Sequence, residues 1–408
     1  MGRQARTSSS ALTPMKWLTR FIKYSLEENF FGRSGLIGEG NDALIRIYKD
    51  LTVTKGNKVR IPMTGPLTGV GGGDNFSSED IMEAYDAFYM DVEIHERGHT
   101  TGLSGPMTKQ HMIEDWPRQA TEKLASWAGV NDEKEIIKAL SGLYNLSTSV
   151  ESVNEHAPTT RRIAYGGETK AGVIEANACL ADGTTLGPYA AGTKATTDAL
   201  LSAETETDNL MGPNFLEKCV IHFMNSEPRP RLLTIDGRKC LLFIMTPWQG
   251  ADMRQNTIYI NRNQYAQVRG NKNPLLSDSM GFWNCGEVSV LLKEYGRMES
   301  RTGAGGTTPT EGFTLNTANS ATSDAVASGV NVGRALLMGA GAGTIAYGAT
   351  KNGQMIDRFN GDLDSGTNRK PFYGIDMIKG ISKTTFDNES DTAQQDMAVM
   401  CIDTIEQH

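Results

Sequence analysis

The residues best suited to chemistry in this chain are two histidines and a glutamate in the segment His95-Glu96-Arg97-Gly98-His99. Their spacing matches the HExxH pattern, in which a helix places both histidines on one face to bind Zn²⁺ while the glutamate activates a water molecule. Here the pattern continues a stretch of alternating apolar and polar residues, which predicts a strand. Residues four apart in a strand are separated by about 13 Å, too far to share one ion. Gly105 also stands where a third histidine is expected. A zinc metallopeptidase is therefore kept only as the alternative function.

A second chemical pattern is Gly341-Ala342-Gly343-Thr344-Ile345-Ala346, which matches the dinucleotide-binding motif GxGxxA. Asp362 or Asp364 follows it at about the 20-residue distance at which that motif carries an acid. No series of strand–helix–strand units follows, however, and the chain contains 44 glycines, so a chance match is expected. An oxidoreductase around Gly341 is a third hypothesis, and close packing of a helix explains these glycines better. Gly69 to Gly73 lacks the GK[ST] of a phosphate-binding loop. No catalytic residue, metal ligand or cofactor is assigned.

The overall composition is typical of a soluble protein with more than one domain. A chain of 408 residues is expected to divide into two or three domains. The net charge of −8 argues against general binding of polyanions. Five widely spaced cysteines without a CxxC pair indicate reduced, mostly buried thiols in a cytosolic protein. No apolar run approaches the 18 residues of a membrane span.

The N-terminal segment differs in charge from the rest of the chain. Residues 1–26 contain no acid and five basic residues: Arg3, Arg6, Lys16, Arg20 and Lys23. Met15 to Leu26 predicts a basic amphipathic helix with Trp17 and Phe21 on its apolar side. Such a helix suits a membrane surface, a transit peptide, or an arm that docks on a neighbouring subunit.

A long two-stranded flap is predicted next. Residues 58–63 and 88–94 each alternate apolar and polar side chains, as half-buried strands do. About two dozen residues connect them, far more than an ordinary hairpin loop contains. This connection includes the glycine-rich stretch Gly65-Pro66-Leu67-Thr68-Gly69. A two-stranded flap is hard to stabilise alone, so we expect it to lie on another subunit.

The stretch from Pro106 to Gly142 predicts the main helical part. Thr108 can cap a helix whose apolar side chains lie on one stripe: Met112, Ile113, Trp116, Ala120, Leu124 and Trp127. Gly129 is expected to end it, and a second helix is expected from Asp132 to Gly142. Pro117 should either kink the helix or mark its true start.

The remaining elements are predicted less sharply. We expect loops and short strands over 146–211, buried strands over 240–245 and 288–292, a helix from Ala251, a helix over 331–348, and short strands towards the end. Pro247 is expected to close the strand that precedes it.

In this order, the segments resemble the major capsid proteins of tailed bacteriophages, specifically the N-four-type podophage group. The resemblance covers roughly residues 15–142. It rests on the following strings: Trp17 to Asn29 with Phe30-Phe31-Gly32, then Val59-Arg60-Ile61-Pro62, then Gly65-Pro66-Leu67-Thr68-Gly69, and finally Gly105 to Gln110 opening the helix that ends at Trp127.

The resemblance implies the HK-ninety-seven-type capsid fold, an α+β fold with an N-terminal arm, an extended β-hairpin loop, a long spine helix and an axial domain. The implied division is an arm over 1–50, the extended loop over 51–95, a peripheral domain with the spine helix over 96–150, the axial domain over 151–330, and a return to the peripheral domain over 331–408.

The function implied by the resemblance is that of a non-enzymatic major capsid protein. Such proteins self-assemble as hexamers and pentamers into an icosahedral shell that encloses double-stranded phage DNA. Portal, scaffold and decoration proteins are the expected partners, the virion capsid is the expected location, and assembly is expected in the host cytoplasm without a membrane. The candidate subunit-interface residues are Trp17, Phe21, Phe30, Phe31, Pro66, Leu67, Gly69, Trp116 and Trp127.

Overall fold

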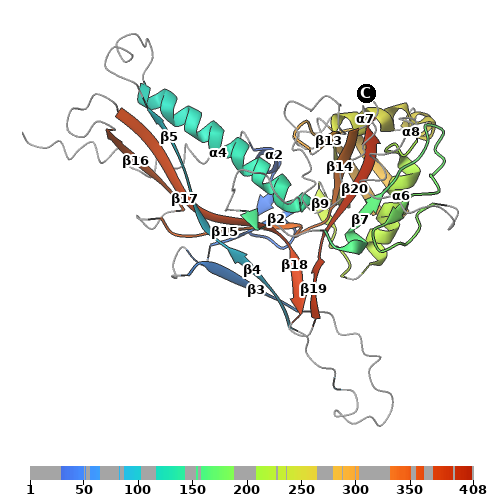
Figure 1. The fold of residues 1–408 in the computed structure, drawn as a ribbon, viewed down its shortest axis with the longest axis horizontal. Coiled ribbons are helices and arrows are strands. Elements are labelled where there is room, and N and C mark those ends of the chain that lie inside the picture. The colour runs from blue at the N-terminus through green and yellow to red at the C-terminus, as the bar shows by residue number, and fades with distance from the viewer. Residues whose placement is uncertain are drawn as a thin grey trace, which may run out of the picture.

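The computed structural model describes the chain in sections: residues 29–49, 51, 56–64, 82, 87–102, 116–142, 153–154, 158–187, 208–226, 228–235, 237–263, 279–286, 288–298, 300–302, 331–350, 355–362, 371–388 and 391–406. The molecule is elongated (Figure 1). A sheet covered by one long helix forms one end, a larger sheet with several short helices forms the other, and a small sheet lies below their junction. Within these sections no helix is long and apolar enough to cross a membrane.

The long helix is α4, which runs without interruption over Trp116–Ser141. The predicted break at Gly129 and the second helix from Asp132 are therefore wrong. Gly129 costs the helix about 1 kcal/mol relative to alanine, but apolar side chains on both sides of it pack against strands and hold the helix together. Pro117 lies in the first turn, where its missing N–H breaks no helical hydrogen bond. Gly142 ends the helix with a φ of +66°, as predicted. The proposed cap Thr108 lies outside the described residues.

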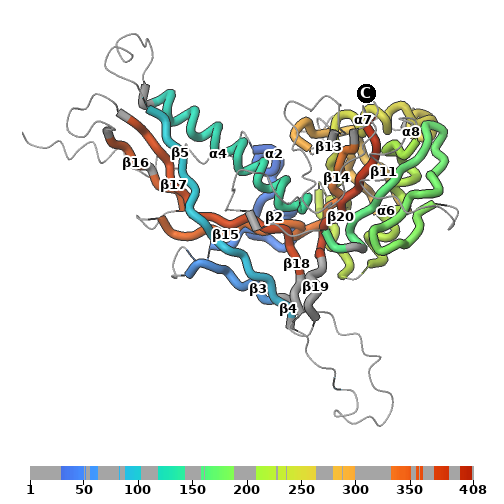
Figure 2. Tube along the Cα trace, in the orientation of Figure 1, coloured from blue at the N-terminus to red at the C-terminus, as the bar shows by residue number. Residues whose placement is uncertain are grey.

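A seven-stranded sheet lies beneath α4. Its strands are β1 (Ile37–Gly38), β2 (Ile45–Tyr48), β15 (Gly343–Tyr347), β17 (Pro371–Lys383) and β16 (Ile356–Asp362), with β5 (His95–Gly102) and β6 (Val153–Asn154) also paired to β17. The first half of β17 lies between β16 and β5, and its second half lies beside β15 and β6. Figure 2 shows N-terminal and C-terminal parts of the chain side by side here, since β2 pairs with β15.

One face of this sheet packs against the helix. Ile375 and Met377 of β17 are buried against Leu124, Ala125 and Ala128 of α4. Side chains alternate along a strand, so the neighbouring positions of β17 point to the opposite face. In its first half, that face is left uncovered by the elements described.

The second sheet has nine strands. They are β11 (Gly281–Cys285), β12 (Val288–Glu294), β10 (Arg238–Met245), β14 (Asn331–Met338), β20 (Val399–Glu406), β7 (Ile163–Tyr165) and β8 (Cys179–Leu180), with β9 (Leu233–Ile235) on β10 and β13 (Ser300–Thr302) on β14. Helices α6 (Pro213–Asn225), α7 (Pro247–Gln255) and α8 (Thr257–Asn263) and the short helix η3 (Thr160–Arg162) accompany it. The central strands are buried on both faces, which explains the unbroken apolar run in β10. The cysteines are free, and four of the five are buried, as predicted.

The predicted flap forms part of a four-stranded sheet. Its strands are β3 (Lys58–Thr64), β4 (Ala87–Glu93), β18 (Thr385–Asn388) and β19 (Asp391–Asp396). The expected alternation is confirmed, because Val59, Ile61, Met90 and Val92 are buried. Lys58 pairs with Glu93, and Arg60 with Asp91, on the other side. Residues 65–81 and 83–86 of the connection lie outside the described residues.

Two further predictions are wrong. Residues 331–348 form β14 and β15 and no helix, because burial on both faces of a strand hides its alternation. Pro247 does not merely end β10, since it occupies the first turn of α7. Thr246 and Gln249 close that turn with reciprocal side-chain to backbone hydrogen bonds. The helix therefore begins before Ala251. Helix α6 and the 13-residue length of β17 were not anticipated.

The chain crosses between the sheets several times. Over 331–408, β14 and β20 belong to the nine-stranded sheet, whereas β15 to β19 belong to the other two. One core of buried side chains contains Ile136, Ile345 and Ile381 beside α4 together with Leu242 and Leu336 of the nine-stranded sheet. The division of the chain into an arm, an extended loop, a peripheral domain, an axial domain and a return segment stays a proposal. The return segment, residues 331–408, contributes strands to both ends of the molecule.

Candidate functional site

The HExxH segment lies in strand β5, as the alternation predicts. His95, Arg97 and His99 share the face towards α4, where Arg97 Nε lies 3.1 Å from Glu135 Oε1. The ring of His99 stacks on Trp127 with a centroid distance of 4.4 Å. Glu96 points to the opposite face, so it cannot activate a water held between the histidines. The described residues contain no group of three or more His, Cys, Asp or Glu suited to a metal. This geometry gives no support to a zinc metallopeptidase.

The GxGxxA segment begins in the turn after β14 and continues into strand β15. Gly341 has a φ of +73°, and β15 follows it directly. The dinucleotide motif requires a helix at that place, because the helix N-terminus binds the pyrophosphate. The glycine is needed for the turn, and the oxidoreductase hypothesis loses its structural basis.

The two adjacent phenylalanines are interior residues of their own subunit. Phe30 and Phe31 begin the short helix α2 (Phe30–Arg33) and are 3% and 0% exposed. Asn29 caps this helix, and the backbone N–H of Phe30 donates to Glu133 Oε2 over 3.0 Å. This differs from the expectation that both rings lie at a subunit interface.

Trp127 is half-buried, and its ring is already partly covered by His99. The structure places Trp116 at the start of α4. The other interface candidates lie outside the described residues: Trp17, Phe21, Pro66, Leu67 and Gly69.

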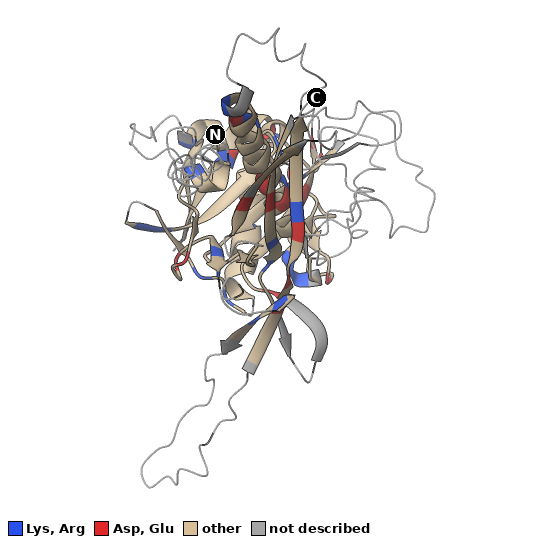
Figure 3. Cartoon of the chain, turned by 90° about the vertical axis from the view of Figure 1, so that its left-hand side faces the viewer, with Lys and Arg blue, Asp and Glu red and all other residues tan. Residues whose placement is uncertain are grey.

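Buried charges fix the second half of α4 to the strands. Lys379 of β17 is 1% exposed, contacts Asp132, and places its Nζ 2.7 Å from Glu135 Oε2. Glu135 also forms an ion pair with Arg97. Glu133 forms an ion pair with Arg297 over 3.3 Å. Figure 3, which colours charged residues by sign, shows that acidic and basic positions also occur close together on strands below this helix. No local pattern in the sequence reveals these ion pairs, because Lys379 and Arg297 are distant in the chain from the acids of α4.

A second buried pair joins the end of α4 to the nine-stranded sheet. Arg334 of β14 donates to both carboxylate oxygens of Asp403 on β20, each over 2.7 Å. Its remaining nitrogen donates to the carbonyl of Ser141, the last residue of α4. The helix is therefore tied to both large sheets.

The uncovered side of β5, β16 and β17 is the surface most suited to binding. We call it the open sheet face and define it by five side chains: Glu96, Asp357, Phe359, Phe372 and Asp376. Their positions follow from the strand register, in which Glu96 is opposite Ile378 and Asp357 is opposite Asp376. Phe359 lies over Gly374 and Phe372 over Gly361, so the two rings form an aromatic shelf. Phe359 is 40% exposed.

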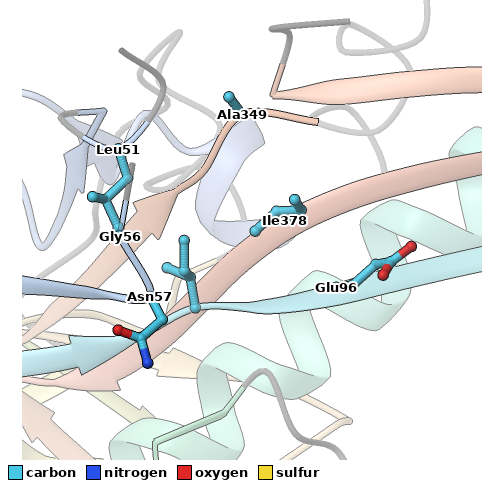
Figure 4. Close-up of a pocket in the computed structure, with 7 residues that line it drawn as sticks. Leu51, Gly56, Asn57, Glu96, Ala349 and Ile378 are labelled. Atoms are coloured by element: carbon cyan, nitrogen blue, oxygen red, sulfur yellow. The ribbon is translucent and has the colours of Figure 1, made fainter. Parts of the chain in front are cut away.

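One of these carboxylates, that of Glu96, lines a shallow pocket. The pocket has a volume of about 420 Å³ and is lined by Leu51, Gly56, Asn57, Ile94, Glu96, Ala349 and Ile378. Figure 4 shows Glu96 and Ile378 on neighbouring strands at its edge. The open sheet face thus continues from the aromatic shelf through an acidic patch to this pocket.

Comparison with known proteins identifies the family. A family model described as "Phage capsid protein" matches residues 5–407. This chain belongs to the phage capsid protein family. Among curated proteins no sequence matches it.

Solved phage structures show the same fold for this capsid protein. The capsid of Ralstonia phage GP4 is similar with a TM-score of 0.66 and 18% identity, over 93% of this chain and 92% of that one. The capsid of cyanophage Pam1 has a TM-score of 0.60 and 16% identity, with coverage of 91% and 90%. The head of Helicobacter pylori bacteriophage KHP40 has a TM-score of 0.59 and 13% identity, with coverage of 93% and 91%.

The fold of the capsid protein is therefore the HK-ninety-seven-type α+β fold, as expected. The chain is a structural component of the phage shell, and its location is the virion capsid. The metallopeptidase alternative has no support in these comparisons either.

The acidic patch of the open sheet face consists of Glu96, Asp357 and Asp376. It makes the free energy of unfolding of the capsid protein depend on pH. Burial raises the pKa of Asp376, and the neighbouring carboxylates of Glu96 and Asp357 raise it further. Because the folded chain binds this proton more tightly than the unfolded chain, the contribution of Asp376 to stability falls as the pH rises through the raised pKa.

We expect Asp376→Asn to stabilise the unassembled subunit at neutral pH by up to about 1 kcal/mol, since it removes a like-charge pair across two strands. The gain should shrink as the pH falls through the raised pKa of Asp376, because the wild-type carboxyl then becomes protonated. Urea unfolding of both chains at several pH values measures this. A gain that stays constant with pH would contradict the assignment.

Proposed function

We propose that this chain is a major capsid protein of the N-four-type podophage group that assembles as hexamers and pentamers into an icosahedral shell enclosing double-stranded DNA. The resemblance of residues 15–142 to that group supports the subgroup. The observation that carries assembly is the open sheet face. An aromatic shelf and three carboxylates lie on one side of a sheet whose other side packs against α4 through Ile375 and Met377.

The charge of the chain is consistent with a container for DNA. A net charge of −8 does not favour strong binding of a polyanion, so the shell can hold a genome and release it. We propose no sequence-specific DNA contact and no enzymatic activity. Portal, scaffold and decoration proteins are proposed partners, and the host cytoplasm is the proposed place of assembly.

Many weak contacts can make such a shell stable, because each subunit binds several neighbours at once. In this proposal, residues 1–50 act as an arm, 51–95 as an extended loop on a neighbour, and α4 as the spine helix of the peripheral part. Electron microscopy and sedimentation velocity of the chain expressed alone test assembly. We expect closed shells or capsomer-sized rings, and a monomer at all concentrations would contradict the proposal.

Deletion of residues 1–26 is expected to prevent shell closure while leaving the subunit folded. The buried side chains that pack α4 against the sheets, among them Phe31, Ile136 and Ile381, are kept in the shortened chain, so the thermal unfolding temperature should change little. Electron microscopy would show rings or free subunits in place of shells. Wild-type shells from the shortened chain would exclude a role for the arm in closure.

A further inference from the structure

Two stretches of the chain run through two sheets each. Strand β4 passes into β5 with only Ile94 between them, and β17 passes into β18 with only Thr384 between them. The two stretches pair with each other in both sheets, as β5 with β17 and as β4 with β18. Figure 2 shows β4 and β5 as one path from the small sheet to the end of the seven-stranded sheet near the start of α4. We call the sheet of β3, β4, β18 and β19 the flap sheet.

The pairing of the two stretches shifts where they pass from one sheet to the other. Lys379 is paired with His95. An unbroken ladder would therefore pair Asp387, eight residues further on, with Ala87, eight residues further back. The structure pairs Asp387 with Tyr89, two positions away. Extra residues on one strand bend it and increase its twist, so the flap sheet turns away from the seven-stranded sheet at this crossing.

The crossing is packed without spare room. A Cβ at Gly380 would lie 1.9 Å from the carbonyl oxygen of Glu93, because the two backbones touch there. Gly348 is similarly confined, since a Cβ at that position would lie 2.8 Å from the side chain of Ile94. The N–H of Ile94 donates to the carbonyl of Asn57 over 2.9 Å, next to the start of β3. A rotation of the flap sheet about this point would force these atoms together or break this hydrogen bond.

The second stretch is fixed by a buried ion pair and by the backbone. Lys383 at the end of β17 places its Nζ 2.7 Å from Asp396 Oδ1, and the two side chains are 1% and 2% exposed. Asp396 is the last residue of β19, so the ion pair closes the base of the β18–β19 hairpin. The N–H of Thr384 donates to the carbonyl of Ala342, and its own carbonyl accepts from the N–H of Met397. Both stretches are therefore fastened at the crossing.

The flap sheet also packs against its own subunit. The buried side chains Val59, Ile61, Met90 and Val92 of β3 and β4 form one cluster with Ala346 of β15. Apolar burial is favourable roughly in proportion to the area removed from water, so a tilt that uncovers these side chains is unfavourable. The base of the flap is thus supported before it meets another subunit.

We propose that the crossing at Ile94 and Thr384 is a fixed joint, which holds the flap sheet at one angle to the seven-stranded sheet and α4 in the free subunit, and that this angle sets the inclination between neighbouring subunits in the shell. A preformed flap loses little conformational freedom on binding, which favours association. The joint is a property of the single subunit, whereas its effect on inclination rests on the proposed assembly into a shell.

Pulsed electron paramagnetic resonance on the unassembled full-length subunit measures the joint. Arg60→Cys on β3 and Lys123→Cys on α4 carry the spin labels, because both side chains are exposed. Cys285→Ser removes the one cysteine of the five that is not buried. We expect a single narrow distribution of distances between the labels, with the same centre in assembled shells. A broad distribution in the free subunit, or a centre that moves on assembly by more than the width of the distribution, would overturn the joint.

A variant with a loosened crossing tests the effect on the shell. Ile94→Gly with Thr384→Gly should widen the distance distribution at least about twofold, since glycine is the least restricted residue. Its shells should become uneven in size. Thr100→Gly with Asn360→Gly is the matched control, because it makes two glycine changes at exposed positions of β5 and β16 away from the crossing. Its distance distribution and its shells should equal those of the wild type.

The outcomes separate the joint, its effect and the proposed function. Shells of wild-type size and uniformity from a variant with a widened distribution would show that the angle does not set the inclination. Thr384→Gly alone is the variant to compare if the double variant does not fold, because it keeps the side chain of Ile94. Absence of shells from the wild type would refute the proposed function, while the distances in the free subunit would still decide whether the joint is fixed.

Discussion

Replacement of Lys379 by methionine is expected to destabilise the subunit by about 3 kcal/mol or more. Removing one partner from a buried ion pair leaves an uncompensated charge in a poorly solvated place, which costs about 3–5 kcal/mol. Lys379 is 1% exposed and contacts Asp132 and Glu135. We expect the lower part of the range, because Glu135 keeps Arg97 and the side chain of Asp132 remains 22% exposed.

Denaturant unfolding of the unassembled subunit measures this effect. Adding Asp132→Asn and Glu135→Gln to Lys379→Met should recover much of the lost stability, since no buried carboxylate is then left without its lysine. Lys49→Met is the matched control, because Lys49 pairs with Glu39 on the surface and such pairs contribute at most about 1 kcal/mol. If both methionine variants unfold at the wild-type denaturant concentration, the buried network does not hold the helix.

Replacement of Gly380 by alanine is expected to displace the four-stranded sheet. Strand β4 crosses β17 so closely that a Cβ at position 380 would lie 1.9 Å from the carbonyl oxygen of Glu93. Backbone atoms cannot move aside as a flexible side chain can, so the cost should reach or exceed the roughly 3 kcal/mol of severe overpacking.

Hydrogen exchange of β4 and denaturant unfolding measure that change. We expect faster exchange over residues 88–93 together with lower stability. Gly40→Ala is the control, because no atom lies within 4 Å of a Cβ placed there. Unchanged exchange in the Gly380→Ala chain would show that the two strands do not approach so closely.

The strands that can be predicted from the sequence are those with one buried face and one solvent-exposed face. The alternation in β3 and β4 is visible because Val59 and Val92 are buried while Arg60 and Asp91 pair outside. Strand β14 lies inside the nine-stranded sheet, is buried on both faces, and therefore lacks this signal. A run of small and apolar residues then fits a helix as well as a strand.

The candidate site could be predicted only in part. Local patterns predict the two strands of the flap and most of the long helix, which the structure contains. The open sheet face needs the register of three strands whose residues are far apart in the chain, and no spacing reveals that Asp357 faces Asp376. No spacing reveals the partner of Asp132 and Glu135 either, since Lys379 lies more than two hundred residues away in the chain. Phe30 and Phe31 were assigned to an interface because nothing nearby in the sequence shows that Glu133 anchors them inside.

The last described strand of the chain, β20, occupies a central position in the nine-stranded sheet. Strand β20 is buried along its whole length between β14 and β7. Until β20 has been synthesised, β7 and β14 each have one unpaired edge. Unpaired strand edges favour aggregation. A chain truncated before residue 399 never closes that gap. Only a chain that includes this strand can therefore complete the nine-stranded sheet.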